Sequence, residues 1–283
     1  VAGGVPGTAP RAPINGGAPP PRDGANTGGA HVPPPYLREW HHYQARTPVT
    51  EYGTFYGIGV GPGDPELMTI KAQKILQKAQ HVFTPIAAEG RESIAHTIAQ
   101  QFISPDATVT KLLFPMIRDK ALCEKSWEEN SHQIARVLKQ GTDATFLTLG
   151  DPMTYSTYGY LLKKMEALYP QVNAVTIPGV PSYLAVAAAS NLPLVEGGET
   201  LTLVPGNTPP EKIREFLSTS DTILFLKHHR NAETIYNILQ EMDLDDKALY
   251  VSRCGFEEHL TTTKPTKDFL EKPDYLSLII VKK

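Results

Sequence analysis

Three short loops rich in glycine and proline hold the residues of this sequence that are best placed to bind a ligand. They are residues 57–65 (GIGVGPGDP), 149–157 (LGDPMTYST) and 178–182 (PGVPS). Each loop follows an apolar run that is typical of a β-strand. Open α/β sheets bind ligands where their parallel strands end, and those ends share one edge of the sheet. We therefore expect the three loops to line one rim.

The first loop is poorly suited to a phosphate group. It contains no G-x-G-x-x-G sequence, and no acidic residue ends a second strand about 20 residues further on, as a dinucleotide site would require. Pro62 and Pro65 lack backbone N–H donors, and Asp64 and Glu66 add negative charge, whereas phosphate favours donors and positive potential. A neutral or cationic ligand fits this charge better. The alternative of equal weight is a plain turn, in which glycines supply positive φ angles.

The elements that must position these loops alternate between strand and helix. Expected strands are 54–60, 81–84, 108–113, 144–148 and 172–177, and expected helices are 69–79, 93–102, 120–139 and 156–169. Such alternation implies right-handed crossovers and a mostly parallel sheet.

The pattern changes after Pro178. An alanine-rich helix is expected over 182–190, with Ser182 as its N-cap. Further strands are expected at 200–204, 222–226, 248–252, 259–263 and 275–281. Some of them are close together without intervening helices, which indicates a mixed sheet. We therefore expect a flexible extension over 1–52, an N-terminal α/β domain over 53–175 and a C-terminal α/β domain over 176–283.

Length and composition exclude several classes of protein. The 283 residues are enough to bury a large core, and the net charge of −3 does not favour nucleic-acid binding. No apolar run approaches the roughly 18 residues of a membrane helix. The two cysteines, Cys123 and Cys254, form no CxxC pair, so we expect neither a disulfide framework nor a zinc site. Cytoplasmic localisation is the default expectation.

The N-terminal 50 residues differ from the rest, since they hold 8 of the 22 glycines and 10 of the 25 prolines. They lack apolar periodicity, so we expect a flexible extension. The segment has no apolar core of a signal peptide, and we do not expect secretion. An aromatic patch formed by Tyr36, Leu37, Trp40 and Tyr43 could dock on the body or on a partner.

Three sequence runs resemble the tetrapyrrole methyltransferase family. They are YGIGVGPGDPELMTIKAQKIL, LTLGDPMTYSTYGYLL and IPGVPSYLAVAA, and the resemblance extends in order over residues 53–283. Within the family, Phe114-Pro115-Met116, the GDPMTYST string and Leu226-Lys227 are most similar to the C-20 methyltransferases of precorrin-2 or cobalt-factor II. Uroporphyrinogen-III methyltransferases usually have Gly-Gly-Asp instead of Leu149-Gly150-Asp151. They also have an acidic residue where this chain has Thr84-Pro85.

The resemblance implies a homodimer of two-domain α/β subunits that binds S-adenosylmethionine between its domains. Carried over motif by motif, the cofactor contacts would be Pro62, Leu149, Gly150, Asp151, Thr154, Pro181, Ser182, Leu226 and Ser277. The sulfonium of this cofactor is a cation, in agreement with the acidic first loop. Asp151 would accept a hydrogen bond from the ribose or, with equal weight, would cap the following helix.

The implied reaction transfers a methyl group to the C-20 meso carbon of the macrocycle in corrin (cobalamin) biosynthesis. Such a transfer depends mainly on holding two reactants in line. The catalytic base is unknown, with Asp151, Tyr155 and Tyr158 as candidates. The carboxylates of the substrate require cationic partners, and we expect Lys227 to be one of them. We also expect Tyr155 and Tyr158 at the substrate site. The other cationic candidates are Arg230, Arg118, Lys120 and Arg253. Each could instead be a solvated or helix-terminal charge, and we favour that interpretation for Arg118, Lys120 and Arg253.

The two adjacent histidines do not indicate a metal site. His228 and His229 are neighbours that would point to opposite faces of a strand, so we expect no protein-held metal. The alternatives are another tetrapyrrole C-methyltransferase such as a uroporphyrinogen-III methyltransferase, a non-catalytic S-adenosylmethionine-binding module, and a nucleotide-dependent oxidoreductase. We expect a small-molecule tetrapyrrole substrate and no partnership with nucleic acid or membranes.

Overall fold

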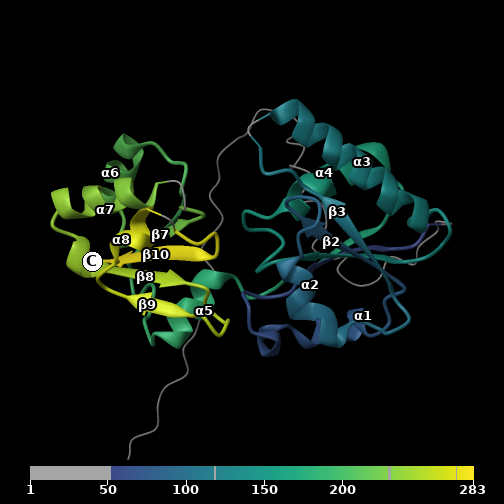
Figure 1. The fold of residues 1–283 in the computed structure, drawn as a ribbon, viewed down its shortest axis with the longest axis horizontal. Helices are drawn as coiled ribbons and strands as arrows, with labels where there is room; N and C mark the ends of the chain where they lie inside the picture. The colour runs from purple at the N-terminus through teal and green to yellow at the C-terminus, as the bar shows by residue number, and fades with distance from the viewer. Residues whose placement is uncertain (1–51, 118, 229–230, 272) are drawn as a thin grey trace, which may run out of the picture. The chain divides into compact units, whose positions relative to one another are not determined.

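The first sheet contains five parallel strands. The computed structural model describes residues 52–117, 119–228, 231–271 and 273–283 (Figure 1). The strands are β1 (Phe55–Gly59), β2 (His81–Ile86), β3 (Thr108–Leu113), β4 (Ala144–Thr148) and β5 (Ala174–Ile177). Their order across the sheet is β3-β2-β4-β1-β5, and every pairing is parallel. The predicted parallel sheet of the N-terminal half is therefore confirmed.

Four helices cover the two faces of this sheet. They are α1 (Ile70–Leu76), α2 (Ile94–Ala99), α3 (Lys120–Leu138) and α4 (Thr157–Leu168). Because side chains alternate along a strand, Phe146 and Leu147 of β4 point to opposite faces. Leu147 lies in a buried cluster with residues of α1 and α2, whereas Phe146 lies in a cluster with residues of α3 and α4. Short 3₁₀ turns, η3 (Pro65–Leu67) and η4 (Gln100–Phe102), flank α1 and α2.

Polar N-caps set the starts of these helices. The side chains of Thr69, Ser93 and Ser156 accept hydrogen bonds from backbone N–H groups in the first turns of α1, α2 and α4. Each of these helices was predicted to begin one residue earlier, at its cap. The difference is physical, because a capping residue has extended rather than helical backbone angles.

The second sheet is mixed, as predicted. Its strands are β6 (Leu201–Pro205), β7 (Thr222–Leu226), β8 (Ala248–Ser252), β9 (Leu260–Thr262) and β10 (Ser277–Lys282). Their order is β6-β7-β10-β8-β9, in which β6 and β7 pair in parallel and the other pairs are antiparallel. Figure 1 shows this sheet with the helices α6 and α7 above it.

Three helices of this half were missing from the prediction. They are α6 (Pro210–Thr219), α7 (Ala232–Glu241) and α8 (Lys267–Glu271), accompanied by the 3₁₀ turn η5 (Asp245–Lys247). Ile213 and Leu217 of α6 pack with Ile235, Ile238 and Leu239 of α7 in a buried cluster on one face of the sheet. The expected absence of helices between neighbouring strands therefore holds only for β8 and β9.

The chain passes from the first sheet to the second at residues 178–181. β5 continues to Ile177, two residues past the predicted boundary at 175, and α5 (Ser182–Ala189) follows. Ala185 and Val186 of α5 pack against Leu224 of β7 and Ile280 of β10. Among the helices that the structure describes, none is long and apolar enough to cross a membrane. The aromatic patch Tyr36–Tyr43, Arg118, His229 and Arg230 lie outside the described residues.

Candidate functional site

The three glycine- and proline-bearing loops meet at one edge of the first sheet. β4, β1 and β5 are neighbours, and all of them run in the same direction. The backbone N–H of Gly150 donates to the carbonyl of Gly61 at 2.8 Å, and the two residues form an isolated antiparallel bridge. The prediction that the loops share a rim is confirmed. We refer to residues 59–64, 149–156 and 178–182 as the glycine rim.

Close backbone contact explains why glycine is required at two positions of the glycine rim. A Cβ atom added to Gly179 would lie 2.2 Å from the carbonyl oxygen of Gly150. A Cβ atom on Gly59 would lie 2.6 Å from that oxygen and from the backbone nitrogen of Gly179. These neighbours are backbone atoms, which cannot rotate away as the end of a side chain can. The glycine rim is thus assembled mainly from backbone, with little tolerance for side chains.

Asp151 fastens two loops of the glycine rim to each other. Its Oδ1 accepts a hydrogen bond from the backbone N–H of Met153 at 2.9 Å, and its Oδ2 accepts one from Gly179 at 3.2 Å. The alternative that Asp151 caps the following helix is wrong, because the N-cap of α4 is Ser156. Both carboxylate oxygens face protein donors, so Asp151 holds the loops after β4 and β5 in place.

Pro181 and Ser182 lie where the third loop enters α5. The structure places Pro181 at the N-cap position and makes Ser182 the first helical residue, so the predicted capping role of Ser182 is wrong. Proline has the extended backbone that an N-cap needs, and here φ is −72° and ψ is 150°. The half-buried hydroxyl of Ser182 consequently stays available at the glycine rim.

The charge of the glycine rim indicates what it can bind. Asp64 and Asp151 lie in these loops, Glu66 follows directly, and no Lys or Arg occurs in them. Pro62 is buried, and the Asp64 carboxylate caps the turn after it through the N–H of Glu66. An anionic phosphate would meet no cationic side chain in these loops. The loops offer hydroxyl, carbonyl and carboxylate oxygens and no Lys or Arg. Such a surface fits a ligand that carries a positive charge.

Leu226 and Ser277 lie together at an edge of the second sheet. β7 ends at Leu226, and antiparallel β10 begins at Ser277, so that Leu226 pairs with Leu278. The hydroxyl of buried Ser277 donates to the carbonyl of Asp274 at 2.5 Å and lies 3.4 Å from Nε2 of buried His228. This edge is therefore fixed by buried polar contacts.

A direct contact joins this edge to the glycine rim. Nζ of Lys227 donates a hydrogen bond to the carbonyl of Tyr155 at 2.5 Å. The hydroxyl of Tyr155 lies 3.5 Å from the carbonyl of Leu203 on β6. Lys227 and Tyr155 both have left-handed backbone, with φ of 55° and 49°. Such strain in non-glycine residues often occurs at functional sites.

Desolvation changes the ionisation of this pair. The side chain of Lys227 as a whole is exposed, but its ammonium group lies among protein atoms, and the desolvation lowers its pKa. Burial raises the pKa of the Tyr155 phenol, which therefore stays protonated at neutral pH. A protonated phenol can donate a hydrogen bond but is not a base.

Tyr158 is a core residue. Its side chain is fully buried, its hydroxyl lies 2.8 Å from Oγ1 of Thr176, and its ring fills the space left by Gly57. A Cβ atom on Gly57 would lie 2.1 Å from that ring. The prediction that Tyr158 contacts substrate does not fit this position, because the core keeps the side chain away from any bound molecule.

Two other predicted groups have structural partners. Thr84 is fully buried and donates to Oγ of Ser93 at 2.5 Å. The guanidinium of Arg253 pairs with Asp274 at 2.7 Å and with Glu258 at 3.4 Å. Of the two interpretations of Arg253, the structure favours the structural charge. Thr84 provides no base.

Contacts with the loop after β8 were not predicted. A Cβ atom on Gly63 would lie 2.6 Å from the ring of Phe256, and one on Gly255 would lie 2.7 Å from the backbone nitrogen of Asp64. The first loop of the glycine rim therefore packs against residues 254–256. The glycines at 63 and 255 were the available signal, but a local pattern does not say which distant segment approaches them.

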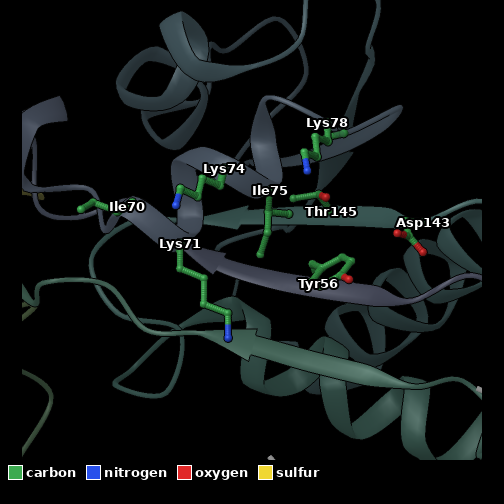
Figure 2. Close-up of a pocket in the computed structure, with 9 residues that line it drawn as sticks. Tyr56, Ile70, Lys71, Lys74, Ile75, Lys78, Asp143 and Thr145 are labelled. Atoms are coloured by element: carbon green, nitrogen blue, oxygen red, sulfur yellow. The ribbon is translucent and has the colours of Figure 1, made fainter. Parts of the chain in front are cut away.

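A groove of about 560 Å³ lies at the opposite end of the first sheet (Figure 2). Tyr56 and Thr145, the second residues of β1 and β4, line it together with Lys71, Lys74 and Ile75 of α1. The glycine rim lies at the other ends of these strands. None of the groove-lining residues is a predicted site residue. In the part of the chain that the structure describes, no cluster of three or more His, Cys, Asp or Glu residues could hold a metal ion.

The chain belongs to the tetrapyrrole (corrin/porphyrin) methylases, whose family profile matches residues 54–269. A probable cobalt-precorrin-2 C(20)-methyltransferase of Methanocaldococcus jannaschii is 36% identical over 230 residues, which cover 81% of this chain and 95% of the relative. A precorrin-2 C(20)-methyltransferase of a Sinorhizobium species is 28% identical over 237 residues, which cover 81% and 95%.

Solved structures share the fold. A cobalt precorrin-4 methyltransferase superposes with a TM-score of 0.59 at 24% identity, covering 81% of this chain and 94% of the other. A uroporphyrin-III C-methyltransferase of Thermus thermophilus, solved as a complex with S-adenosyl homocysteine, superposes with a TM-score of 0.56 at 21% identity and covers 81% and 92%. The architecture predicted from the sequence, two α/β domains of the tetrapyrrole methylase type, is confirmed.

Proposed function

We propose that this chain is an S-adenosylmethionine-dependent C-methyltransferase that methylates the C-20 meso carbon of precorrin-2 or cobalt-factor II in corrin biosynthesis. Relatives with this named activity support the choice of substrate class. The observation that carries the proposal is the glycine rim, in which three strand-end loops provide backbone and acidic groups but no Lys or Arg. A rim of this charge suits a cationic sulfonium better than a phosphate.

The proposed cofactor contacts combine backbone and small polar groups. They are Pro62, Leu149, Gly150, Asp151, Thr154, Pro181, Ser182, Leu226 and Ser277. S-adenosylmethionine supplies an electrophilic methyl group on its sulfonium sulfur. In this arrangement the hydroxyl of Ser182 and the backbone of Leu149 would provide hydrogen bonds, Gly150 would contribute close backbone contact, and Asp151 holds two loops together.

The contribution of the protein is mainly positional. The rigid glycine rim would hold one reactant and the surface beyond it the other, so that the nucleophilic carbon attacks in line. The proton that C-20 loses must pass to an acceptor. Asp151 already accepts two backbone hydrogen bonds, and Tyr155 is protonated, so neither is well prepared to take it. We assign no catalytic base. Lys227 is the proposed partner of a substrate carboxylate, and the exposed Tyr155 lies beside it.

Cofactor binding is tested by calorimetry and thermal shift with S-adenosylmethionine and S-adenosylhomocysteine, without added metal. We expect stoichiometric binding. Absence of binding heat and of any thermal shift at millimolar cofactor would contradict the proposal. NAD in a parallel titration addresses the oxidoreductase alternative, which requires binding of that nucleotide.

The substrate is tested with radiolabelled S-adenosylmethionine under anaerobic conditions. Precorrin-2, cobalt-factor II and uroporphyrinogen III are offered in separate reactions. We expect label in one or both of the first two. Transfer only to uroporphyrinogen III would favour the alternative methyltransferase, and cofactor binding without transfer to any of the three would favour a non-catalytic module.

Assembly and location complete the proposal. The resemblance to the family supports a cytoplasmic homodimer. Light scattering should give a mass near twice the 31.0 kDa of the chain, and a monomer mass at micromolar concentration would contradict a dimer.

A further inference from the structure

The other half of the same sheet edge has a different construction. Because β2 and β3 run parallel to β4, β1 and β5, the loops after them project at the edge that carries the glycine rim. The sheet order places these loops beside the loop after β4, about 5 Å apart for each strand. In the loops after β2 and β3 the exposed surface is formed by side chains, whereas in the glycine rim it is formed mainly by backbone.

Large apolar side chains are exposed in the loop after β3. Met116 is 50% exposed and Ile117 is 49% exposed, although Phe114 of the same loop is almost fully buried. Two strand positions away, on the loop after β4, Met153 of the glycine rim is 65% exposed. Exposed groups of this size, when gathered at a ligand-binding edge, often form part of the binding surface.

Residues of α3 hold the backbone of the β3 loop in place. The side chains of Ser126 and Asn130 both donate to the carbonyl of Leu113, at 2.7 and 2.8 Å. The thiol of buried Cys123 points to the carbonyls of Pro115 and Ile117, at 3.6 and 3.7 Å. Asn130 is almost fully buried. Residues of α3 therefore hold the end of β3 at Leu113 and contact the following loop at Pro115 and Ile117, while Met116 and Ile117 stay exposed.

A cationic group lies on the loop between these two. Arg91 follows β2, and within the described residues no carboxylate lies within ion-pair distance of its guanidinium. The adjacent Glu92 instead pairs with Lys111 at 2.7 Å, and Glu89 is the other charge of this loop. An exposed guanidinium without an internal partner can bind a carboxylate through two parallel hydrogen bonds.

We propose that Met116, Ile117 and Arg91 form the substrate-binding half of the edge. Met116 and Ile117 contact the apolar face of the macrocycle, and Arg91 binds one of its carboxylates. We refer to these three residues as the open rim. The inference rests on the proposed function, because it assumes a flat ring with peripheral carboxylates as the second reactant. The arrangement separates the two ligands, with backbone for the cofactor and side chains for the macrocycle.

The test measures macrocycle binding directly. Cobalt-factor II is titrated by its absorbance into protein saturated with S-adenosylhomocysteine, so that no turnover is required. For a Met116→Gln/Ile117→Gln double variant we expect at least fivefold weaker binding, and for Arg91→Gln about tenfold weaker binding. Affinity for S-adenosylhomocysteine should stay within twofold, because the open rim does not include the glycine rim.

Matched variants separate this role from general effects. Leu168→Gln removes an exposed leucine from the end of α4, which is distant from the edge, and should leave macrocycle affinity unchanged. Met116→Leu/Ile117→Leu keeps the apolar surface and should restore binding to within twofold. Melting temperatures of all variants check folding.

The outcomes distinguish this inference from the proposed function. If wild-type protein binds cobalt-factor II and the open-rim variants bind it as well as Leu168→Gln, the inference is wrong and the proposed function stands. If wild-type protein binds neither S-adenosylhomocysteine nor any tetrapyrrole, the proposed function itself fails. If Met116→Leu/Ile117→Leu also loses macrocycle binding while still folded, Met116 and Ile117 do not act through apolar contact, and the inference is again wrong.

Discussion

The glycine rim and the open rim occupy one edge of the same sheet but are built in different ways. In the glycine rim, backbone touches backbone, and Gly59 and Gly179 leave no space for a Cβ atom at the contact. In the open rim, the backbone is fixed by α3 from behind, and Met116 and Ile117 extend into solvent. The comparison indicates that a change in the glycine rim should act on the whole edge, whereas a change in the open rim should act on a single ligand.

The largest effect is expected for Gly179→Ala. The new methyl group would lie 2.2 Å from the carbonyl oxygen of Gly150, so the loops after β4 and β5 must separate. Such overpacking costs roughly 1–3 kcal/mol. We expect the melting temperature to fall by about 5 °C or more and S-adenosylhomocysteine affinity to fall at least 100-fold. Differential scanning calorimetry and isothermal titration measure the two losses.

Gly159→Ala is the matched control. Gly159 lies in α4, and a Cβ atom there would meet no atom within 4 Å. Alanine is the better helix former by about 1 kcal/mol, so this variant should be slightly stabilised and bind normally. If Gly179→Ala behaved like Gly159→Ala, the close packing of the glycine rim would not matter for binding.

A smaller and more selective effect is expected for Lys227→Met, at the link between the second sheet and the glycine rim. Lysine and methionine meet the same strain at the positive φ of position 227, so the substitution removes mainly the charge. We expect macrocycle affinity to fall about tenfold, which corresponds to about 1.4 kcal/mol. Affinity for S-adenosylhomocysteine should stay within about twofold.

The pH dependence of macrocycle binding tests the same residue. Desolvation lowers the pKa of Lys227, so the ammonium loses its charge at a lower pH than an ordinary lysine. Affinity of the wild type for a carboxylated ring should therefore fall as the pH rises through that value, and Lys227→Met should lack this fall. Equal losses of both ligands in Lys227→Met would instead assign the ammonium to the cofactor.

Local sequence patterns were sufficient for much of this edge. Five apolar runs predicted the parallel strands, and the Gly/Pro loops after three of them predicted the shared rim. The pattern on α4 could also have placed Tyr158, since Tyr158, Leu161 and Met165 form one buried stripe at helical spacing. The helices α6 and α7 were missed although their buried residues lie at helical spacing, with Ile213 and Leu217 on α6 and Ile235, Ile238 and Leu239 on α7.

Contacts between distant segments could not be predicted in this way. The bond between Lys227 and Tyr155 joins residues that are 72 positions apart, and it depends on positive φ angles that lysine and tyrosine rarely adopt. The bond between Asp151 and the N–H of Gly179 spans 28 positions and is set by the neighbouring places of β4, β1 and β5. Such contacts follow from the order of strands in the sheet, which no local pattern determines.

Tyr158→Phe examines the layer beneath the glycine rim. The variant loses the hydrogen bond to Thr176 but keeps the ring that packs on Gly57. We expect a loss of about 1 kcal/mol in the free energy of unfolding, from urea titration, because one neutral hydrogen bond contributes about that much. The KM for the tetrapyrrole should not change. A KM increase above fivefold at unchanged stability would return Tyr158 to the substrate site.

The smallest effect is expected for Tyr250→Phe, in the core of the second sheet. Tyr250 is fully buried between Tyr236 and Phe269, and within the described residues its hydroxyl has no hydrogen-bond partner. Burial raises the pKa of this phenol, so it remains protonated and contributes no pH dependence at neutral pH. Removing a buried hydroxyl without a partner also removes its desolvation cost, while the aromatic packing is kept. We therefore expect stability between unchanged and about 1 kcal/mol higher, measured by urea titration, with both ligand affinities unaltered. A loss above about 1 kcal/mol would mean that a buried water or a shifted side chain satisfies the hydroxyl. A change in ligand affinity would mean that the core of the second sheet is coupled, through Leu226 and Lys227, to the edge of the first sheet. The two rims would then not act independently of the second sheet.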